Sequence, residues 1–209
     1  MKKILKVILR IIYLFILKHI WFLRPIYETR GTTHEISLKM WFIQKVIGIH
    51  RNVPWPVHHT MYIGGVQNIK MGVGSSLGDN KEIYVQAIGK IEIGDYTRIA
   101  AYSRLLCSNH NIYDHREHIE GKILIGRYCW LGIGCTILPN VILGDHTIVG
   151  AGAVVTKSFP DGYCVVAGNP AKVVKYLDRD KCIEYKHEHE YVGYTRKDKL
   201  KESDTFYNG

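Results

Sequence analysis

Between residues 123 and 158 the chain places an aliphatic side chain at every sixth position. These positions are Ile125, Leu131, Ile137, Leu143, Val149 and Val155. A compact side chain lies four residues after each of the first five aliphatic positions. These compact residues are Cys129, Cys135, Val141, Thr147 and Ala153. A helix repeats every 3.6 residues and a strand every 2, so neither explains the pattern. A six-residue period is typical of a parallel β-helix, in which short strands wind around a prism-shaped core.

The period is weaker before residue 123, and the stretch 106–122 breaks it. Aliphatic–glycine pairs such as Met71–Gly72 and Ile93–Gly94 carry the earlier part of the repeat. Residues 106–122 are polar, rich in histidine and without the aliphatic repeat, so we expect a loop thrust out of the prism. Turn sequences such as Gly78–Asp79–Asn80, Gly144–Asp145 and Pro139–Asn140 should form the corners, where unusual backbone angles favour glycine, Asp and Asn.

The repeat divides the chain into three parts. Residues 1–56 form an N-terminal helical segment, in which 37–49 has the apolar content of a helix. Residues 57–168 form the β-helix domain with its loop at 106–122. Residues 169–209 follow, beginning after Asn169–Pro170 with a short helix over 171–177 and ending in a charged, loosely packed tail.

The first 24 residues are basic and very apolar. Their longest uncharged run, 11–17, is too short to cross a bilayer, and no small-residue cleavage site follows it. On a helical wheel the basic residues gather on one side and the aliphatic residues on the other. Two interpretations stand equally: an amphipathic helix lying on a membrane, or a helix packing on its own domain or on a partner subunit.

Composition narrows the classes of partner. The formal net charge of +9 favours anionic ligands, yet no nucleic-acid-binding motif is present, so we expect no nucleic-acid partner. The five cysteines form no CxxC pair, and Cys129 and Cys135 occupy the compact position of the repeat. They should behave as small buried side chains in a reduced, cytoplasmic protein. If residues 1–24 bind lipid, the protein would be peripheral at the inner face of the membrane.

The position before each repeat aliphatic suggests an oligomer. It holds Trp130, Thr136, Ile142, Ile148 and Val154. Because an exposed apolar column is normally covered, we expect prisms to associate, most simply as a homotrimer.

Several stretches of the chain resemble the hexapeptide-repeat acyltransferases, in the branch of galactoside, maltose and polysaccharide O-acetyltransferases. They are Ser108–Asn109–His110, residues 125–132 (IGRYCWLG), residues 149–157 (VGAGAVVTK) and residues 166–174 (VAGNPAKVV). The resemblance spans roughly residues 60–177. It implies a left-handed parallel β-helix, a trimer with active sites between subunits, and acetyl-CoA as donor.

The resemblance assigns His110 as the catalytic base. A neutral imidazole can accept a proton from a sugar hydroxyl, and the oxygen then attacks the thioester directly. A zinc site formed by His110, His115 and His118 is the alternative, although three histidines on one loop lack a supporting motif, and we expect no metal.

The resemblance also assigns residues to the donor. Trp130 would line the channel for the pantetheine arm, and Gly132, Ile133, Gly150, Ala151 and Gly152 would offer backbone amides. The adenosine phosphates would meet the side chains of Thr156, Lys157, Lys172 and Lys175.

The acceptor is less defined. Asn80 lies at the family's offset for an acceptor-binding Asn, but Ile88 stands where related sugar acetyltransferases use a carboxylate. Gln86 and Asp114 are the substitutes we expect, on a saccharide other than a simple galactoside. We therefore expect O-acetylation of a surface-polysaccharide precursor. The alternatives are N-acetylation of an amino sugar or of a xenobiotic such as an antibiotic, a non-catalytic scaffold, and a carbonic anhydrase.

Overall fold

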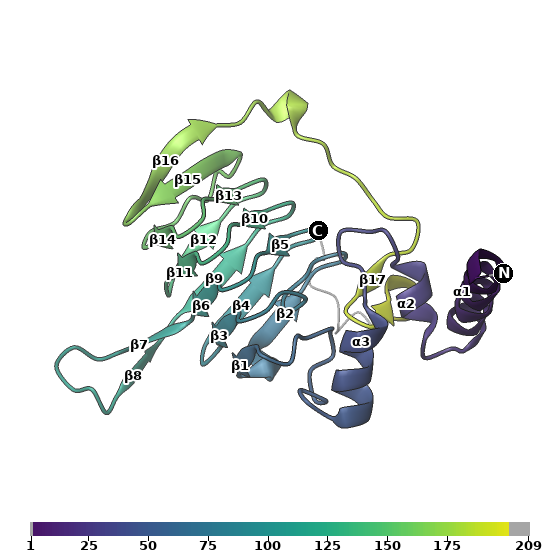
Figure 1. The fold of residues 1–209 in the computed structure, drawn as a ribbon. Helices are drawn as coiled ribbons and strands as arrows, with labels where there is room; N and C mark the ends of the chain where they lie inside the picture. The colour runs from purple at the N-terminus through teal and green to yellow at the C-terminus, as the bar shows by residue number, and fades with distance from the viewer. Residues whose placement is uncertain (1, 201–209) are drawn as a thin grey trace.

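The computed structural model describes residues 2–200, and its centre is a prism of three parallel sheets (Figure 1). Sheet A consists of β1 (Tyr62–Gly64), β3 (Tyr84–Gln86), β6 (Arg104–Leu106), β11 (Thr136–Ile137) and β14 (Val154–Val155). Sheet B consists of β2 (Ile69–Met71), β4 (Lys90–Ile93), β9 (Lys122–Ile125) and β12 (Ile142–Leu143). Sheet C consists of β5 (Arg98–Ile99), β10 (Trp130–Leu131), β13 (Ile148–Val149), β15 (Cys164–Gly168) and the antiparallel β16 (Ala171–Tyr176).

The regular part of the chain visits sheets A, B and C in turn. Trp130 pairs with Ile148 and Thr136 with Val154, so one coil takes 18 residues and each sheet receives six of them. The predicted all-β parallel architecture is thereby confirmed as three parallel sheets. The turns between the sheets stack into three edges, which we name the A–B, B–C and C–A edges after the sheets that they join.

The interior of the prism follows the repeat. The aliphatic residues from Ile125 to Val155 are at most 1% exposed, and so are the compact residues from Cys129 to Ala153. They belong to one continuous core that extends down to Val53 and Trp55. All five cysteines are free and four of them are buried, as the compact slot requires. Burial raises the pKa of the Cys129 thiol to about 12, so this thiol is not a nucleophile at neutral pH.

The role expected for the corner glycines is only partly right. Gly78 and Asn140 have positive φ values of 125° and 65°, as the prediction requires. At the B–C edge, however, the positive φ of 54° belongs to His146, whereas a Cβ added at Gly144 would collide with the carbonyl oxygen of Pro160. Glycine is needed there because neighbouring coils approach too closely for a side chain.

Aromatic rings occupy the positive-φ positions of the B–C edge and stack along it. Ring centroids are 5.2 Å apart between Tyr96 and Tyr128, 5.0 Å between Tyr128 and His146, and 4.9 Å between His146 and Tyr163. Tyr128 donates its hydroxyl to the carbonyl oxygen of Tyr185 at 2.8 Å. The B–C edge is thus covered by its own rings and by the C-terminal segment (residues 178–200).

The outward apolar residues do not form the single column that the sequence suggested. Trp130 and Ile148 lie on sheet C, Thr136 and Val154 on sheet A, and Ile142 on sheet B. Residues six apart lie on different sheets because each sheet receives only every third six-residue unit of the repeat. Trp130 is 55% exposed, while the other four are half-buried. This column therefore gives no argument for a trimer.

The expected protruding loop is confirmed, and it is a β-hairpin. β7 (Ser108–His110) and β8 (His118–Glu120) pair antiparallel and project from the A–B edge (Figure 1). Cys107 and Gly121 close its base through a 2.8 Å backbone hydrogen bond. The coil resumes above the hairpin because Ile91 pairs directly with Ile123.

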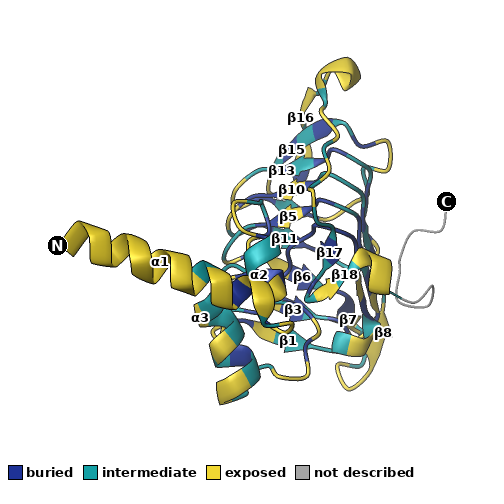
Figure 2. Ribbon diagram, turned by 90° about the vertical axis from the view of Figure 1, so that its right-hand side faces the viewer, coloured by how far each residue is buried: buried dark blue, intermediate teal, exposed yellow. Residues whose placement is uncertain are grey.

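The N-terminal segment is helical, as predicted. It comprises α1 (Lys2–His19), α2 (Arg24–Glu28), α3 (Leu38–Trp41) and the π-helix η1 (Phe42–Ile47), followed in the prism by the 3-10 turn η2 (Val66–Asn68). Figure 2 shows α1 extending away from the body, with only Leu17 buried in it. Packing of its apolar face on its own domain is therefore wrong. Within residues 2–200 no helix has the length and apolar character needed to span a membrane.

Two C-terminal expectations are wrong. Residues 171–176 form strand β16 rather than a helix, because the open edge of β15 offers backbone partners to the β-branched pair Val173–Val174. The tail is not loosely packed over its described part. It contains η3 (Arg179–Lys181), β17 (Tyr191–Val192), β18 (Thr195–Arg196) and η4 (Lys197–Lys199). Residues 201–209 lie outside the described part.

The C-terminal segment is tied to the N-terminal helices by tyrosine hydroxyls. Tyr191, 3% exposed, donates to the Glu28 carboxylate, and Tyr194 donates to Gln44 Oε1 at 2.7 Å. The charged composition of the segment did not predict these contacts, because each joins residues at least 150 positions apart.

Candidate active site

The hairpin holds His110 in a defined orientation. Its Nδ1 lies 2.7 Å from the backbone carbonyl oxygen of His115. A carbonyl oxygen only accepts, so Nδ1 carries the hydrogen and Nε2 of the neutral ring carries the lone pair. The ring is exposed at the end of β7. Its geometry therefore suits a general base that acts through Nε2.

The two other hairpin histidines do not complete a metal site. His115 contributes its backbone carbonyl to His110, and the His118 ring lies tilted by 42° against the His110 ring with centroids 4.3 Å apart. Across residues 2–200 no group of three or more His, Cys, Asp or Glu side chains is arranged to hold a metal ion.

The residues expected to offer backbone amides to the donor gather at the C–A edge, where two of their amides are available. The amides of Gly132, Gly150 and Gly152 already donate to carbonyls of neighbouring coils at 2.7–2.8 Å, so their expected role as donors to a ligand is wrong. Ile133 and Ala151, one coil apart, have amides without a partner among the described residues. The C–A edge thus presents two stacked, unpaired N–H groups.

Glycine keeps this edge open. Gly134 and Gly152 have φ values of 69° and 67°, and a Cβ added at either would meet nothing within 4 Å. Tyr128 and His146 adopt similar angles at the B–C edge, so the backbone alone does not demand glycine. The absence of side chains at 134 and 152 leaves space beside the unpaired amides. The sequence signal was the pair of G-x-G triplets at 132–134 and 150–152, and Gly134 was missed.

Trp130 and two of the predicted lysines lie on the neighbouring sheet. Trp130 points outward from β10 between Arg98 and Ile148, next to the C–A edge. Lys172 and Lys175 are exposed on β16, at the end of the same sheet. The structure therefore groups Trp130, the open edge and these two lysines on one side of the prism.

The remaining donor residues lie elsewhere. Thr156 and Lys157 are exposed at the A–B edge, and the Lys157 ammonium lies 5.9 Å from the centre of the Phe159 ring. This is the edge that carries the His110 hairpin. Within one chain, His110 and Trp130 are thus separated by sheet A.

The three acceptor candidates do not form one group. Asn80 is half-buried at the C–A edge, where its Nδ2 donates to the carbonyl oxygen of Ile99 at 2.9 Å. Gln86 is half-buried at the end of β3. The Asp114 carboxylate is held by the Arg116 guanidinium at 2.7 and 2.9 Å, which lowers the pKa of Asp114. Its charge is already paired within the hairpin.

The regular coils match a known family. Residues 122–157 match the family model described as bacterial transferase hexapeptide (six repeats). The resemblance to the hexapeptide-repeat acyltransferases is confirmed. The match spans β9 to β14, including Trp130 and the open C–A edge, but neither the hairpin nor the N-terminal helices. No curated protein matches the chain.

Solved acetyltransferases share the fold. A maltose O-acetyltransferase from Clostridium difficile 630 is 24% identical with a TM-score of 0.59, over 68% of this chain and 80% of that one. A galactoside acetyltransferase in complex with coenzyme A is 29% identical with a TM-score of 0.55, over 63% and 66% of the two chains. A hexapeptide-repeat acetyltransferase from Vibrio cholerae O1 biovar eltor, complexed with acetyl coenzyme A, is 19% identical with a TM-score of 0.52, over 76% and 86%.

Proposed function

We propose that this protein is an acetyl-CoA-dependent O-acetyltransferase whose acceptor is a hydroxyl of a saccharide, with the coil wound left-handed as in its relatives. The observation that carries the proposal is the orientation of His110, with Nδ1 bonded to a carbonyl and Nε2 free. The 29% identity to a galactoside acetyltransferase that binds coenzyme A supports the donor. The expected acceptor is a precursor of surface polysaccharide.

His110 would move one proton twice. Nε2 removes the proton of the acceptor hydroxyl while its oxygen forms a bond to the thioester carbonyl carbon. The imidazolium is stabilised by its Nδ1–H bond to the His115 carbonyl. When the carbon–sulfur bond breaks, Nε2 returns the proton to the departing thiolate. The products are an acetyl ester and the free thiol of coenzyme A, and no covalent enzyme intermediate is required.

We assign the donor to the C–A edge. The unpaired amides of Ile133 and Ala151 can donate to oxygens of the donor, and Gly134 and Gly152 leave room for it. Trp130, more than half exposed, offers an apolar surface to the pantetheine arm. The exposed ammonium of Lys172 at the end of sheet C suits the phosphates.

This arrangement requires more than one subunit. His110 projects from the A–B edge and the donor residues lie across sheet A at the C–A edge. A site that needs both is completed when the A–B edge of one chain meets the C–A edge of another. Repetition of this unlike contact closes into a ring, and we propose the homotrimer. Lys157, at the A–B edge, would then meet the donor from the neighbouring subunit.

Release of the coenzyme A thiol tests the function. The protein is supplied with acetyl-CoA and with sugars, polysaccharide fragments, amino sugars and aminoglycoside antibiotics as acceptors. His110→Ala is expected to lower the rate by at least about a hundredfold. His115→Ala is the matched control, because His115 acts through its backbone carbonyl and should keep activity within a few-fold.

Each result has a clear consequence. If His110→Ala retains activity within a few-fold, His110 is not the base. Acetylation of amines in preference to hydroxyls would replace O-acetylation by N-acetylation. No thiol release with any acceptor, together with no binding to immobilised coenzyme A, would overturn the transferase assignment.

A further inference from the structure

Helix α1 exposes a continuous apolar stripe to solvent. Ile4, Ile8, Ile11 and Phe15, spaced by three or four residues, lie on one side of the helix and are 48–65% exposed. Figure 2 shows that the body of the protein does not cover this part of α1. An apolar helical face of this length is costly to leave in water, so it needs an occupant.

The opposite stripe of α1 is basic. Lys3, Lys6 and Arg10 are exposed and continue the helical line of Leu17, the buried residue by which α1 meets the protein. The helix contains no acidic residue. An apolar stripe on one side and a cationic stripe on the other is the arrangement of a helix in a membrane interface, with lysines reaching back to the headgroups.

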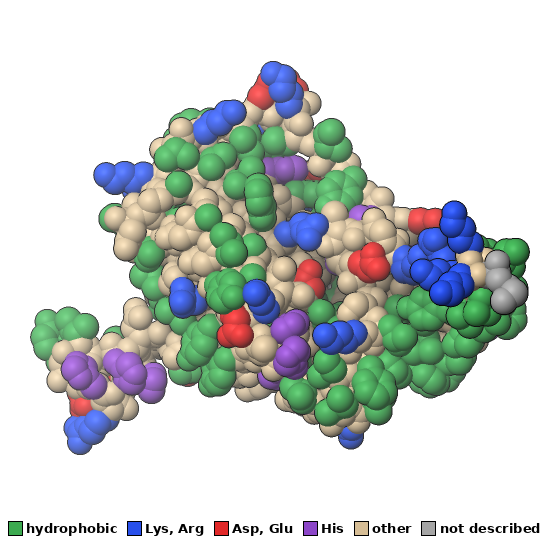
Figure 3. All heavy atoms as spheres, viewed as in Figure 1, with side chains coloured by type: hydrophobic (Ala, Val, Ile, Leu, Met, Phe, Trp, Pro, Cys, Tyr) green, Lys and Arg blue, Asp and Glu red, His purple; other side chains and the backbone are tan. Residues whose placement is uncertain are grey.

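A second helix exposes apolar side chains in the same region. Phe42, Val46 and Ile47 of η1 are 48–59% exposed. In Figure 3, hydrophobic side chains over α1 and over the α3–η1 region lie along one border of the molecule. Trp21, 82% exposed, follows α1 directly, and Trp is favoured at the headgroup level of bilayers.

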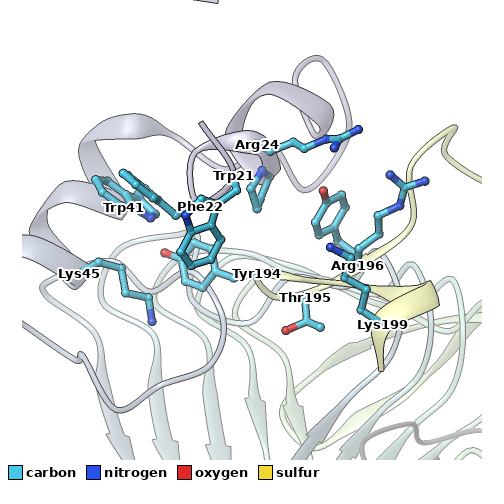
Figure 4. A pocket seen from close by; sticks show the side chains of 11 residues that line it. Trp21, Phe22, Arg24, Trp41, Lys45, Tyr194, Thr195, Arg196 and Lys199 are labelled. Carbon is cyan, nitrogen blue, oxygen red and sulfur yellow. The ribbon is translucent and has the colours of Figure 1, made fainter. Parts of the chain in front are cut away.

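A cavity of about 430 Å³ opens between α2, the α3–η1 region and the C-terminal segment, next to the residues that follow α1 (Figure 4). Aromatic side chains form part of its wall, including Trp21, Phe22 and Trp41. No acidic residue lines it, whereas four cations do: Arg24, Lys45, Arg196 and Lys199. Aromatic walls with several cations suit an amphipathic anion.

Two of these cations lack an acidic partner. Arg24 and Arg196 contact the Glu28 carboxylate at 2.7 and 3.5 Å. Lys45 and Lys199 form no ion pair among the described residues. The Lys45 ammonium donates to the carbonyl oxygen of Val53 at 3.3 Å and lies 4.7 Å from the centre of the Tyr194 ring. Burial, aided by Arg51, lowers the pKa of Lys45. An anion in the cavity would compensate this cost.

We propose that this surface binds an anionic phospholipid bilayer, with α1 lying in the interface and the cavity receiving a lipid phosphate. The exposed apolar stripe, the cationic stripe opposite it and the lysines without an acidic partner all match one ligand class, an acyl chain joined to a phosphate. This lipid-binding function is independent of the proposed acetyl transfer. Its role would be to hold the enzyme beside acceptors carried on lipid.

Vesicle sedimentation with the full chain tests the proposal. Vesicles of phosphatidylcholine alone and of phosphatidylcholine mixed with phosphatidylglycerol are compared. The protein should sediment with the anionic vesicles, and more weakly as salt is raised. Ile8→Asp/Ile11→Asp, which changes two exposed side chains, should lower the vesicle affinity by at least about a hundredfold. Circular dichroism checks that the variant stays folded.

A second pair of variants isolates the cavity. Lys45→Gln/Lys199→Gln should weaken binding to anionic vesicles about thirtyfold, since each lysine near a membrane contributes about fivefold. Lys90→Gln/Lys122→Gln removes the same charge from exposed positions on sheet B and should change binding less than threefold.

The outcomes decide between the occupants. Equal losses for the two lysine pairs would show a general charge effect and overturn the phosphate site. No sedimentation with anionic vesicles would overturn membrane binding, whatever the transferase assay shows. If the vesicle-free protein forms an assembly that Ile8→Asp/Ile11→Asp dissociates, a second copy covers α1, and the proposal is wrong.

Discussion

Replacing Gly126 by Ala should destabilise the protein far more than replacing Gly134, although only Gly134 has a positive φ. A Cβ at Gly126 would lie 2.6 Å from the backbone nitrogen of Asp145 and 2.7 Å from the carbonyl carbon of Gly144. Ordinary contacts begin at 3.4 Å, so the two coils must move apart. A Cβ at Gly134 would meet nothing within 4 Å, and only its φ of 69° resists the change.

The magnitudes follow from what must move. Separating the coils at Gly126 strains the 2.8 Å bond from its amide to the carbonyl oxygen of Leu143 and the 2.6 Å bond from the Arg127 amide to Asp145. Overpacking of about 1–3 kcal/mol and two weakened hydrogen bonds of about 1 kcal/mol each predict a loss of roughly 3–5 kcal/mol. Gly134→Ala should cost only about 1 kcal/mol, because left-handed strain is partly offset in the unfolded chain.

Urea unfolding followed by far-ultraviolet circular dichroism measures both variants. The midpoint of Gly126→Ala should fall well below that of Gly134→Ala, which should lie close to the parent. Equal midpoints, or a lower one for Gly134→Ala, would refute the view that close approach of coils selects the glycines of the B–C edge. Gly134→Ala is also expected to weaken coenzyme A binding if the C–A edge holds the donor.

Three further predictions concern single side chains. Trp130→Ala should raise the KM for acetyl-CoA about tenfold without changing the melting temperature, whereas Trp21→Ala should leave that KM unchanged. Burial, with smaller effects of His187 and Arg98, lowers the pKa of His34 to about 4. Since the unfolded chain binds that proton with a pKa of about 6.5, the free energy of unfolding should fall as pH drops from 6.5 to 4, and His34→Gln should flatten this titration. Tyr191→Phe should lower the free energy of unfolding by about 1–3 kcal/mol, because Glu28 loses a buried hydrogen bond.

The interior of the prism was predictable because one rule fixes it. Each coil must place an aliphatic side chain on the axis from each sheet, so Leu131 and Val149 are recognisable from spacing alone. The hairpin was predictable for the opposite reason, since a segment without the aliphatic repeat cannot line the core. His110 was a candidate because Ser108–Asn109–His110 resembles the family's motif, and its tautomer became clear only from the contact to His115.

Other features of the fold and the candidate site depend on how neighbouring coils pair. The six-residue period does not specify this pairing. The outward residues Trp130 and Thr136 belong to different sheets because pairing runs at 18 residues. The free amides of Ile133 and Ala151 depend on which neighbouring groups are already bonded. The strand at 171–176 depends on the unpaired edge of β15, a tertiary effect that outweighs local preference.

The contacts between the N-terminal helices and the C-terminal segment can form only late in synthesis. Coils pair with neighbours 18 residues away and can form while the chain is emerging from the ribosome. The contact of Tyr191 with Glu28 joins residues 163 positions apart, so it waits for nearly the whole sequence. The cationic cavity, walled by both ends, therefore exists only in a finished molecule. A prematurely ended chain could build most of its prism and yet lack this cavity.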